Sequence, residues 1–145
     1  MADAPIPSVV AMLICDQIIN EEGTNKKSLI GVFENVNSPI FPLLIPRLAV
    51  YVKLVDARGV YLFKLRFVRL KDESLVADFG IQGNIGDSSH HSELVLNVGN
   101  LPIPEPGKYE FQLYYEDIFL HRVTIDAVQV QAQGGIPWPP SPSKL

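Results

Sequence analysis

The sequence has almost no cysteine. Cys15 is the only one in 145 residues, so the chain cannot form an internal disulfide. Disulfides stabilise small secreted domains, whereas reduced thiols are typical of proteins in reducing compartments. We therefore expect a cytoplasmic protein, in which Cys15 is a small buried residue of an apolar segment rather than an activated nucleophile.

The chain is also short of charge. Charged residues make up 19% of it and apolar residues 47%, whereas disordered chains combine low hydrophobicity with a high net charge. A length of 145 residues is the usual size of one domain. We predict one folded domain over residues 9–130, preceded by an extension over residues 1–8 and followed by a proline-rich extended tail over residues 131–145.

An excess of positive charge is missing too. The net charge is −4, so the domain as a whole lacks the surplus of lysine and arginine that binds phosphate backbones. No basic residue precedes Lys26, and Asp16 ends the apolar run of residues 9–15. Neither a signal peptide nor a membrane span fits this pattern. We expect neither a nucleic acid nor a membrane among the partners.

Helical periodicity is absent, and alternation with a period of two takes its place. In residues 47–54 the side chains Leu48, Val50, Val52 and Leu54 fall on one face, and Arg47, Tyr51 and Lys53 fall on the other. Residues 61–69 alternate in the same way. A turn signal at residues 56–59 separates the two runs, so we predict that they form a hairpin with one buried and one solvated face.

About eight such runs predict an all-β fold, a two-sheet antiparallel β-sandwich with Greek-key connections. A closed barrel is the alternative. Residues 37–46 contain three prolines among large apolar residues, and we interpret them as a crossover between the two sheets. Residues 101–107 also contain three prolines. Because proline cannot donate to a β-ladder, we predict an ordered connection there.

Several stretches of the sequence are distinctive. They are residues 13–16 (LICD), 28–33 (SLIGVF) and 106–113 (PGKYEFQL), with the short segments Phe41-Pro42, Pro46-Arg47-Leu48 and Leu101-Pro102. Together they resemble a family of uncharacterised bacterial proteins, a domain of unknown function. The resemblance spans almost the whole chain and implies an immunoglobulin-like β-sandwich without assigned catalytic residues. The start of the 106–113 stretch is also similar to the entry of a late strand in many immunoglobulin-like sandwiches, where the tyrosine anchors a corner.

Basic residues are concentrated on the predicted hairpin. Residues 47–71 hold seven basic residues and one acid. Those expected on the solvated face are Arg47, Lys53, Lys64 and Arg66, joined by the outer-face aromatics Tyr51 and Tyr114. Such a surface attracts acidic partners, and exposed aromatic residues are enriched at interfaces. Cross-strand pairing with Glu110 and Glu116 would neutralise the basic residues instead, and the sequence leaves both interpretations open.

The tail offers a further contact. Trp138 lies there among prolines. In one interpretation it folds back over an apolar strip or sheet edge of its own domain. In the other it presents an extended polyproline ligand to another chain.

A second candidate site follows from strand parity. If the strands alternate in direction, one end of the sandwich collects the loops of residues 20–25, 56–59 and 83–92 and the turn at Asp117. The polar side chains gathered there are Glu21, Glu22, Asp56, Asp87, His90, His91, Glu116 and Asp117, of which Asp56, Asp87, His90 and Asp117 are the candidate ligand-binding residues. Carboxylates and imidazoles bind cations. No spacing matches a known metal motif, however, so solvated loops are the simpler explanation.

The sequence contains no recognisable catalytic constellation. Ser88, Ser89 and His90 are too close together for a triad, whose members converge from separate segments, and no glycine-rich phosphate loop leads into a helix. We expect no cofactor and no metal. We favour a non-catalytic interaction or assembly module that forms a homo-oligomer through its sheet faces and tail. Binding of a small ligand, a carbohydrate or a cation at the loop end is the alternative.

Overall fold

The computed structural model describes residues 4–86 and 91–131, and all the regular structure in these ranges is β. The strands are β1 (Ser8–Asn20), β2 (Lys27–Val32), β3 (Asn35–Ser38), β4 (Leu43–Val55), β5 (Gly59–Arg69), β6 (Ser74–Ile85), β7 (His91–Ile103), β8 (Gly107–Tyr115) and β9 (Ile118–Gln129). These nine strands of the described ranges are close to the predicted number of about eight.

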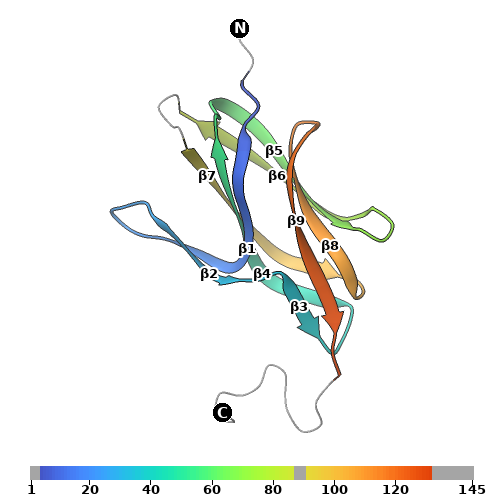
Figure 1. Ribbon diagram of the computed structural model, residues 1–145. Helices are drawn as coiled ribbons and strands as arrows, with labels where there is room; N and C mark the ends of the chain where they lie inside the picture. Colours follow the sequence, from blue (N-terminus) through green and yellow to red (C-terminus); the bar gives the residue numbers. More distant parts are fainter. Residues whose placement is uncertain (1–3, 87–90, 132–145) are drawn as a thin grey trace.

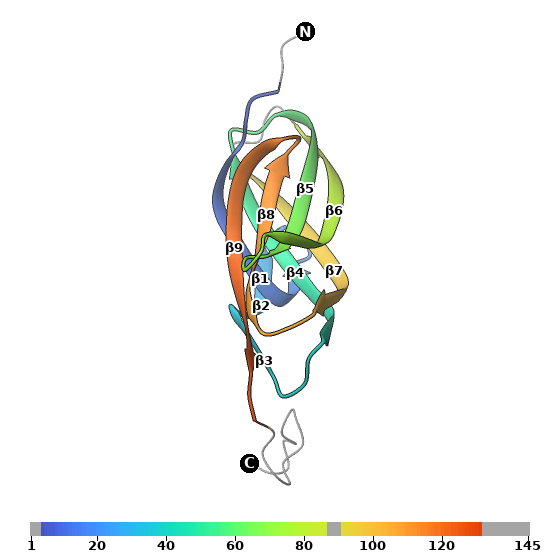
Figure 2. The same cartoon turned by 90° about the vertical axis from the view of Figure 1, so that its right-hand side faces the viewer.

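The strands form two sheets packed face to face (Figure 1). One sheet has four strands in the order β2-β1-β4-β7, and the other has five in the order β3-β9-β8-β5-β6. Figure 2 shows β9, β8, β5 and β6 of the five-stranded sheet in this order. Neighbours are antiparallel except for β3 and β9, which pair in parallel. The predicted all-β, two-sheet sandwich is confirmed, with one parallel pair added to the antiparallel pattern.

The strand order is that of an immunoglobulin-like sandwich. In that fold strands A, B and E are neighbours in one sheet and strands C, F and G in the other, and variable-type domains add C′ beyond C. Here β1, β4 and β7 take the places of A, B and E, whereas β5, β8 and β9 take those of C, F and G, with β6 beyond β5. Neighbours that are far apart in sequence, such as β4 and β7, reflect the predicted Greek-key connectivity.

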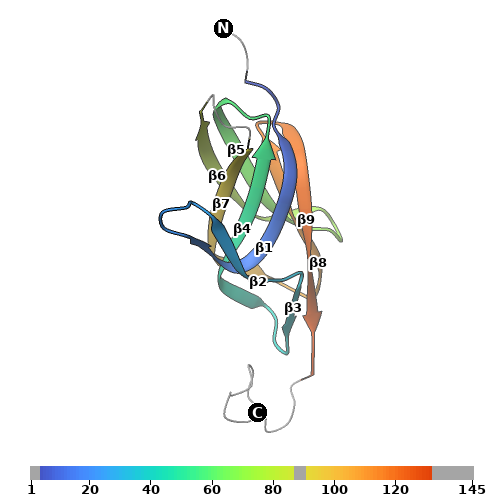
Figure 3. The ribbon, with the colours of Figure 1, turned by 60° about the vertical axis from the view of Figure 1, so that its left-hand side comes forward.

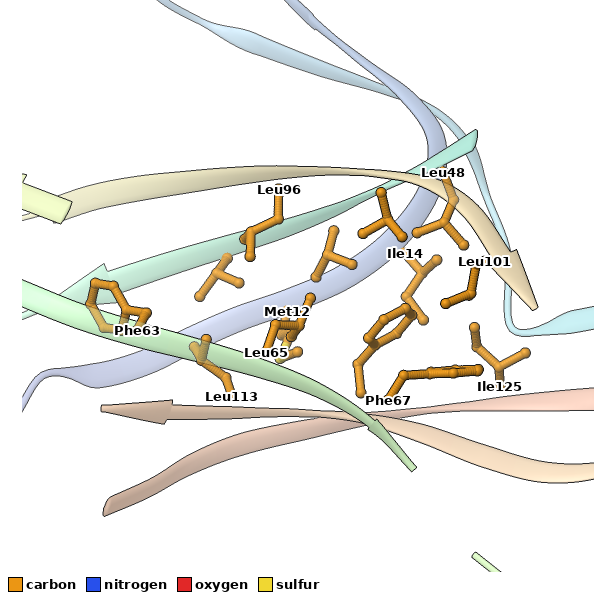
Figure 4. Packing of buried hydrophobic residues seen from close by; sticks show 14 of the residues in the cluster. Met12, Ile14, Leu48, Phe63, Leu65, Phe67, Leu96, Leu101, Leu113 and Ile125 are labelled. Carbon is orange, nitrogen blue, oxygen red and sulfur yellow. The ribbon is translucent and has the colours of Figure 1, made fainter. Parts of the chain in front are cut away.

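The period-two pattern builds a core between the sheets. Over residues 48–54, 61–67 and 109–113 every second side chain is at most 2% exposed: Leu48, Val50, Val52 and Leu54 on β4, Tyr61, Phe63, Leu65 and Phe67 on β5, and Tyr109, Phe111 and Leu113 on β8. In Figure 4, Phe63, Leu65 and Phe67 point from β5 toward the side chains of the opposite sheet. Burying each large side chain contributes about 1.5–3 kcal/mol, so the core is the main source of stability.

The predicted hairpin of residues 47–54 and 61–69 is wrong. β4 and β5 contain these two runs, but they belong to different sheets: β4 pairs with β1 and β7, and β5 pairs with β6 and β8. Asp56 and Gly59 do have positive φ angles, 61° and 115°, as a tight turn requires. A turn signal does not reveal which sheet the chain enters next. Alternation fits two facing strands as well as a hairpin, because both bury every second residue.

The two proline-rich segments differ. Residues 37–46 lead from β3 in the five-stranded sheet to β4 in the four-stranded sheet, so the predicted crossover is confirmed. Residues 101–103, however, belong to β7, where Ile103 pairs with Leu43. The predicted connection over residues 101–107 is therefore wrong at its first three residues. β7 is the last strand of its sheet, and an edge strand is where a sheet tolerates a proline such as Pro102.

Tyr109 anchors the entry into β8, as the 106–113 motif predicts. Its hydroxyl donates to the carbonyl oxygen of Glu105 at 2.7 Å and accepts from the amide of Glu105 at 3.2 Å. Its ring is fully buried and stacks on Phe67 at 5.3 Å between centroids. A tyrosine near the start of strand F that bonds back to upstream backbone is the tyrosine corner of immunoglobulin-like domains.

Loop parity is correct for most of the connections. The β4–β5 connection and the β8–β9 turn lie at the end of the sandwich that carries the N-terminus (Figure 1). Near the opposite end, Arg69 and Lys71 both form ion pairs with Glu105, at 3.2 and 3.3 Å, so the β5–β6 turn and the β7–β8 connection meet there as predicted. The β1–β2 loop is the exception, because it lies at the tip of a projecting hairpin (Figures 1 and 3). Its Glu21 and Glu22 are thus separated from Asp56.

Candidate functional site

A groove of about 400 Å³ lies on the outer face of the five-stranded sheet. It is lined by Lys64, Arg66, Leu75, Asp78, Tyr114, Glu116 and Asp117. Alternation places Lys64, Arg66 and Tyr114, because the odd-numbered residues of β5 and β8 fill the core and the even-numbered ones face outward. Register then sets their neighbours, with Lys64 opposite Tyr114 and Asp78 opposite Arg66.

Aromatic rings form the apolar part of this surface. The guanidinium carbon of Arg66 lies 5.8 Å from the centroid of the Tyr114 ring, which is a cation–π geometry. Tyr114 in turn packs edge-on against Phe119 of β9, at 5.6 Å and 72°. Phe119 is 49% exposed. The tyrosine hydroxyl donates to Oε1 of Gln112 at 3.3 Å. The outer face therefore combines two cations with two adjacent rings.

Neutralisation by Glu110 does not take place. Glu110 is 5% exposed and accepts a hydrogen bond from Nε2 of Gln112 at 2.7 Å. Among the described residues, the ion pairs found do not include Arg47, Lys53, Lys64 or Arg66. Glu116 does line the groove beside Lys64, together with Asp78 and Asp117, so the groove has mixed charge without a direct pair.

Arg47, Tyr51 and Lys53 lie on the outer face of the other sheet, because β4 is not a neighbour of β5. The predicted basic surface is therefore divided between opposite faces of the sandwich. The predicted exposure of Tyr51 is also wrong. Its side chain is only 9% exposed, and its hydroxyl donates to Oε2 of Glu93 on β7. Burial first, and then the Glu93 carboxylate, raise the pKa of Tyr51 to about 12.

Glu93 links β7 to the projecting hairpin. Its Oε1 lies 3.1 Å from Nζ of Lys27, the first residue of β2. Burial disfavours the charged carboxylate, but the bonds from Tyr51 and Lys27 outweigh burial and hold the pKa of Glu93 below its ordinary value. This cluster could not be predicted from the sequence, because its three members lie on three strands whose pairing was unknown.

Arg47 lies in a second groove, of about 450 Å³, between the bent part of β1 and the outer faces of β4 and β7. Its guanidinium donates to Oε1 of Gln17 at 3.2 Å, and Asp16 and Asn97 line the same groove. Unlike Arg66, Arg47 has no aromatic neighbour among the residues that line its groove.

Of the four residues of the alternative site, Asp56 and Asp117 lie within the described ranges, and they do not line one groove. Asp117 lines the groove beside Lys64 and Arg66, whereas Asp56 is exposed at the β4–β5 connection and does not line it. Asp87 and His90, like Trp138, lie outside the described residues. Over residues 4–86 and 91–131, no three His, Cys, Asp or Glu side chains are close enough to hold a metal.

Cys15 is fully buried in β1, as expected for a core residue. Burial first, and then the neighbouring Asp16, raise the pKa of its thiol, so the reactive thiolate is disfavoured. The sequence also missed Asp78 and Phe119. Counting back from the turn at residues 116–117 would have placed Phe119 opposite Tyr114, whereas the irregular β5–β6 pairing, with one extra residue on β6 at Val76, hid the register of Asp78.

Comparisons with known proteins add little on activity. No curated protein matches the chain. An immunoglobulin-like protein (PA1606) from Pseudomonas aeruginosa, known from a crystal structure, is similar, with 12% identity and a TM-score of 0.45 over 85% of this chain and 97% of that one. In the described ranges no helix is long and apolar enough to cross a membrane. The model of a family of unknown function, DUF6941, matches residues 10–128. That match takes in all of β2 to β8 and most of β1 and β9, and the chain therefore belongs to this family.

Proposed function

We propose that the chain is a non-catalytic, cytoplasmic assembly module that self-associates through its outer sheet faces. One observation carries the proposal: Lys64 and Arg66 stand beside the rings of Tyr114 and Phe119 on the outer face of the five-stranded sheet, without a direct ion pair to a described carboxylate. Arginine and aromatic side chains are enriched at the centres of interfaces and supply much of their binding energy.

A second copy of the chain can supply the opposite charge. The net charge is −4, so acidic surface outweighs basic surface on the molecule as a whole. Complementary charges orient partners and speed their encounter, and salt screens them over about 8 Å at physiological ionic strength. Association through Lys64 and Arg66 should therefore weaken as salt is raised.

Charge reversal at Lys64 tests the proposal. Lys64→Glu should lower the average mass measured by light scattering at low salt. Lys108→Glu is the matched control, since Lys108 is an exposed lysine at the start of β8, in the same sheet, that does not line the groove. The proposal fails if both variants keep the wild-type mass and the mass is insensitive to salt.

The segment that follows Gln133, which contains Trp138, is proposed as a further contact between copies. A chain that ends at Gln133 should have a lower average mass than the intact chain at the same concentration. Equal masses would remove the segment from the proposal and leave the sheet faces as the contact.

The same groove favours a second candidate function, the binding of a small polar ligand such as a sugar. A volume of about 400 Å³ lies within the range of ligand sites, and the groove combines the Tyr114 ring with hydrogen-bonding groups of both charges, including Arg66 and Asp117. A bound sugar should raise the melting temperature of the wild type and not that of Tyr114→Ala. No shift with any sugar of a broad panel would exclude this function.

A further inference from the structure

The outer half of β1 and the whole of β2 form a two-stranded ribbon, residues 16–32. The pairing of β1 with β4 ends at Cys15, opposite Ala49, whereas its pairing with β2 continues to Asn20, opposite Lys27. Beyond Cys15, therefore, each strand of the ribbon pairs only with the other among the described residues. Figures 1 and 3 show the ribbon projecting from the sandwich, on the side away from the β5–β6 turn.

The ribbon is too apolar to be an ordinary solvated hairpin. Ile19, Ile30 and Val32 are 43%, 45% and 51% exposed, and all three are β-branched. Such residues favour a sheet surface covered by a neighbour. An isolated two-stranded hairpin is marginally stable in water, and an uncovered edge strand is a template for pairing with another chain. The open edge of β2 is thus a site where a partner strand can pair.

The charged residues that flank β2 indicate which strand pairs with it. Lys26 precedes the strand and Glu34 follows it by two residues; both side chains are exposed, and neither occurs in an ion pair of the described residues. If two copies of β2 pair antiparallel about Ile30, the two Ile30 side chains face each other, and Lys26 of each copy lies at the same end of the pair as Glu34 of the other. Glu34 lies just beyond the strand, where its carbonyl oxygen accepts from the amide of Asp126 on β9 at 2.8 Å. A shift of two residues in either direction would separate the charges. The strand is therefore complementary to itself in one register.

We propose that β2 pairs antiparallel with β2 of a second copy, with the twofold axis at Ile30, which joins the two four-stranded sheets into one. This inference rests on the proposed self-association and gives it a geometry. The contact is isologous, since the same surface serves both copies, so it closes at a dimer. The grooves of the five-stranded sheets remain open and can link dimers further.

A cysteine at the axis tests the geometry. Side chains directly opposite on an antiparallel pair have Cβ atoms about 4.5–5.5 Å apart, close enough for a disulfide after a small adjustment. Because the thiol of Cys15 lies close to the Ile30 backbone, the test uses a Cys15→Ala background, in which Ile30→Cys should form a covalent dimer under mild oxidation. Leu44→Cys on β4 is the matched control, since Leu44 is 56% exposed and lies neither on the ribbon nor in the groove of the five-stranded sheet. Equal cross-linking of the two variants, or none, would overturn the β2 contact.

A charge exchange tests the register independently of cross-linking. Lys26→Glu and Glu34→Lys should each raise the dimer dissociation constant about tenfold, because each variant brings like charges together at both ends of the strand pair. The double variant should restore the wild-type constant. Additive weakening in the double variant would overturn the register.

The outcomes separate this inference from the proposed function. If the wild type is oligomeric but neither Ile30→Cys nor the charge exchange behaves as stated, the β2 contact is wrong and self-association stands. If the wild type is monomeric at every concentration, both fail together.

Discussion

Removing the Tyr109 hydroxyl tests whether the tyrosine corner stabilises the immunoglobulin-like fold. Tyr109→Phe leaves the ring stacked on Phe67 but deletes the bonds to the carbonyl oxygen and the amide of Glu105, at 2.7 and 3.2 Å. A buried hydrogen bond contributes about 0.5–1.5 kcal/mol net, and leaving its partners unsatisfied raises the cost. We expect a loss of about 2 kcal/mol in the free energy of unfolding, which corresponds to a fall of about 7 °C in melting temperature for a domain of this size.

Urea denaturation followed by circular dichroism measures this loss, and the urea dependence of the free energy should stay unchanged, because the surface exposed on unfolding is the same. Tyr114→Phe is the matched control on the same strand. Its hydroxyl makes one bond, of 3.3 Å, at a partly exposed position, so its removal should cost less than about 0.5 kcal/mol. If Tyr109→Phe is no more costly than Tyr114→Phe, the corner is not a stabilising element and the reasoning is refuted.

Three further predictions concern the core, the ribbon and the buried tyrosine. Phe67→Ala should cost about 3–5 kcal/mol in urea denaturation, because the ring is fully buried and its loss leaves a cavity. Gly31→Ala should cost about 1–2 kcal/mol, because φ is +71° at this position and an added Cβ would clash with the Asp16 carboxylate. Adding Asp16→Ala should remove the clash but not the cost of the positive φ. Thermal melts of the single and double variants would measure both contributions. The pKa of Tyr51, raised to about 12 by burial and by Glu93, means that its contribution to stability is complete below the unfolded value near 10 and is lost as the pH rises toward 12. Tyr51→Phe should therefore lose less stability than the wild type between pH 10 and 12, and identical pH profiles would contradict this.

The fold was predictable because strands that are buried on one face have an apolar residue at every second position. Alternating side chains such as Leu48 and Phe63 identify strands, and the Pro-Gly-Lys-Tyr start of β8 identifies the tyrosine corner. Which strands β4 and β5 pair with was not predictable from the same pattern. Residues 56–59 form a turn in either case, and which sheet the chain enters depends on contacts with β1, β7 and β8 that are far away in sequence.

The candidate site was predictable only where it followed from alternation. Lys64, Arg66 and Tyr114 come together because each lies on the outward face of its strand, and β5 and β8 are neighbours. The burial of Tyr51 could not be predicted, because it depends on Glu93 from another strand. It also depends on the bend of β1, which brings Lys27 of β2 to Glu93. The environment of such side chains is set by strands that are far away in sequence, so only the structure shows it.

Self-association is the central claim, and the mass of the intact chain in solution tests it most directly. Light scattering over a range of protein concentrations, at low and at moderate salt, should give an average mass above 16.1 kDa that rises with concentration and falls with salt. A mass of 16.1 kDa at every concentration and salt would contradict the claim and leave the groove of the five-stranded sheet as a ligand site on a monomer.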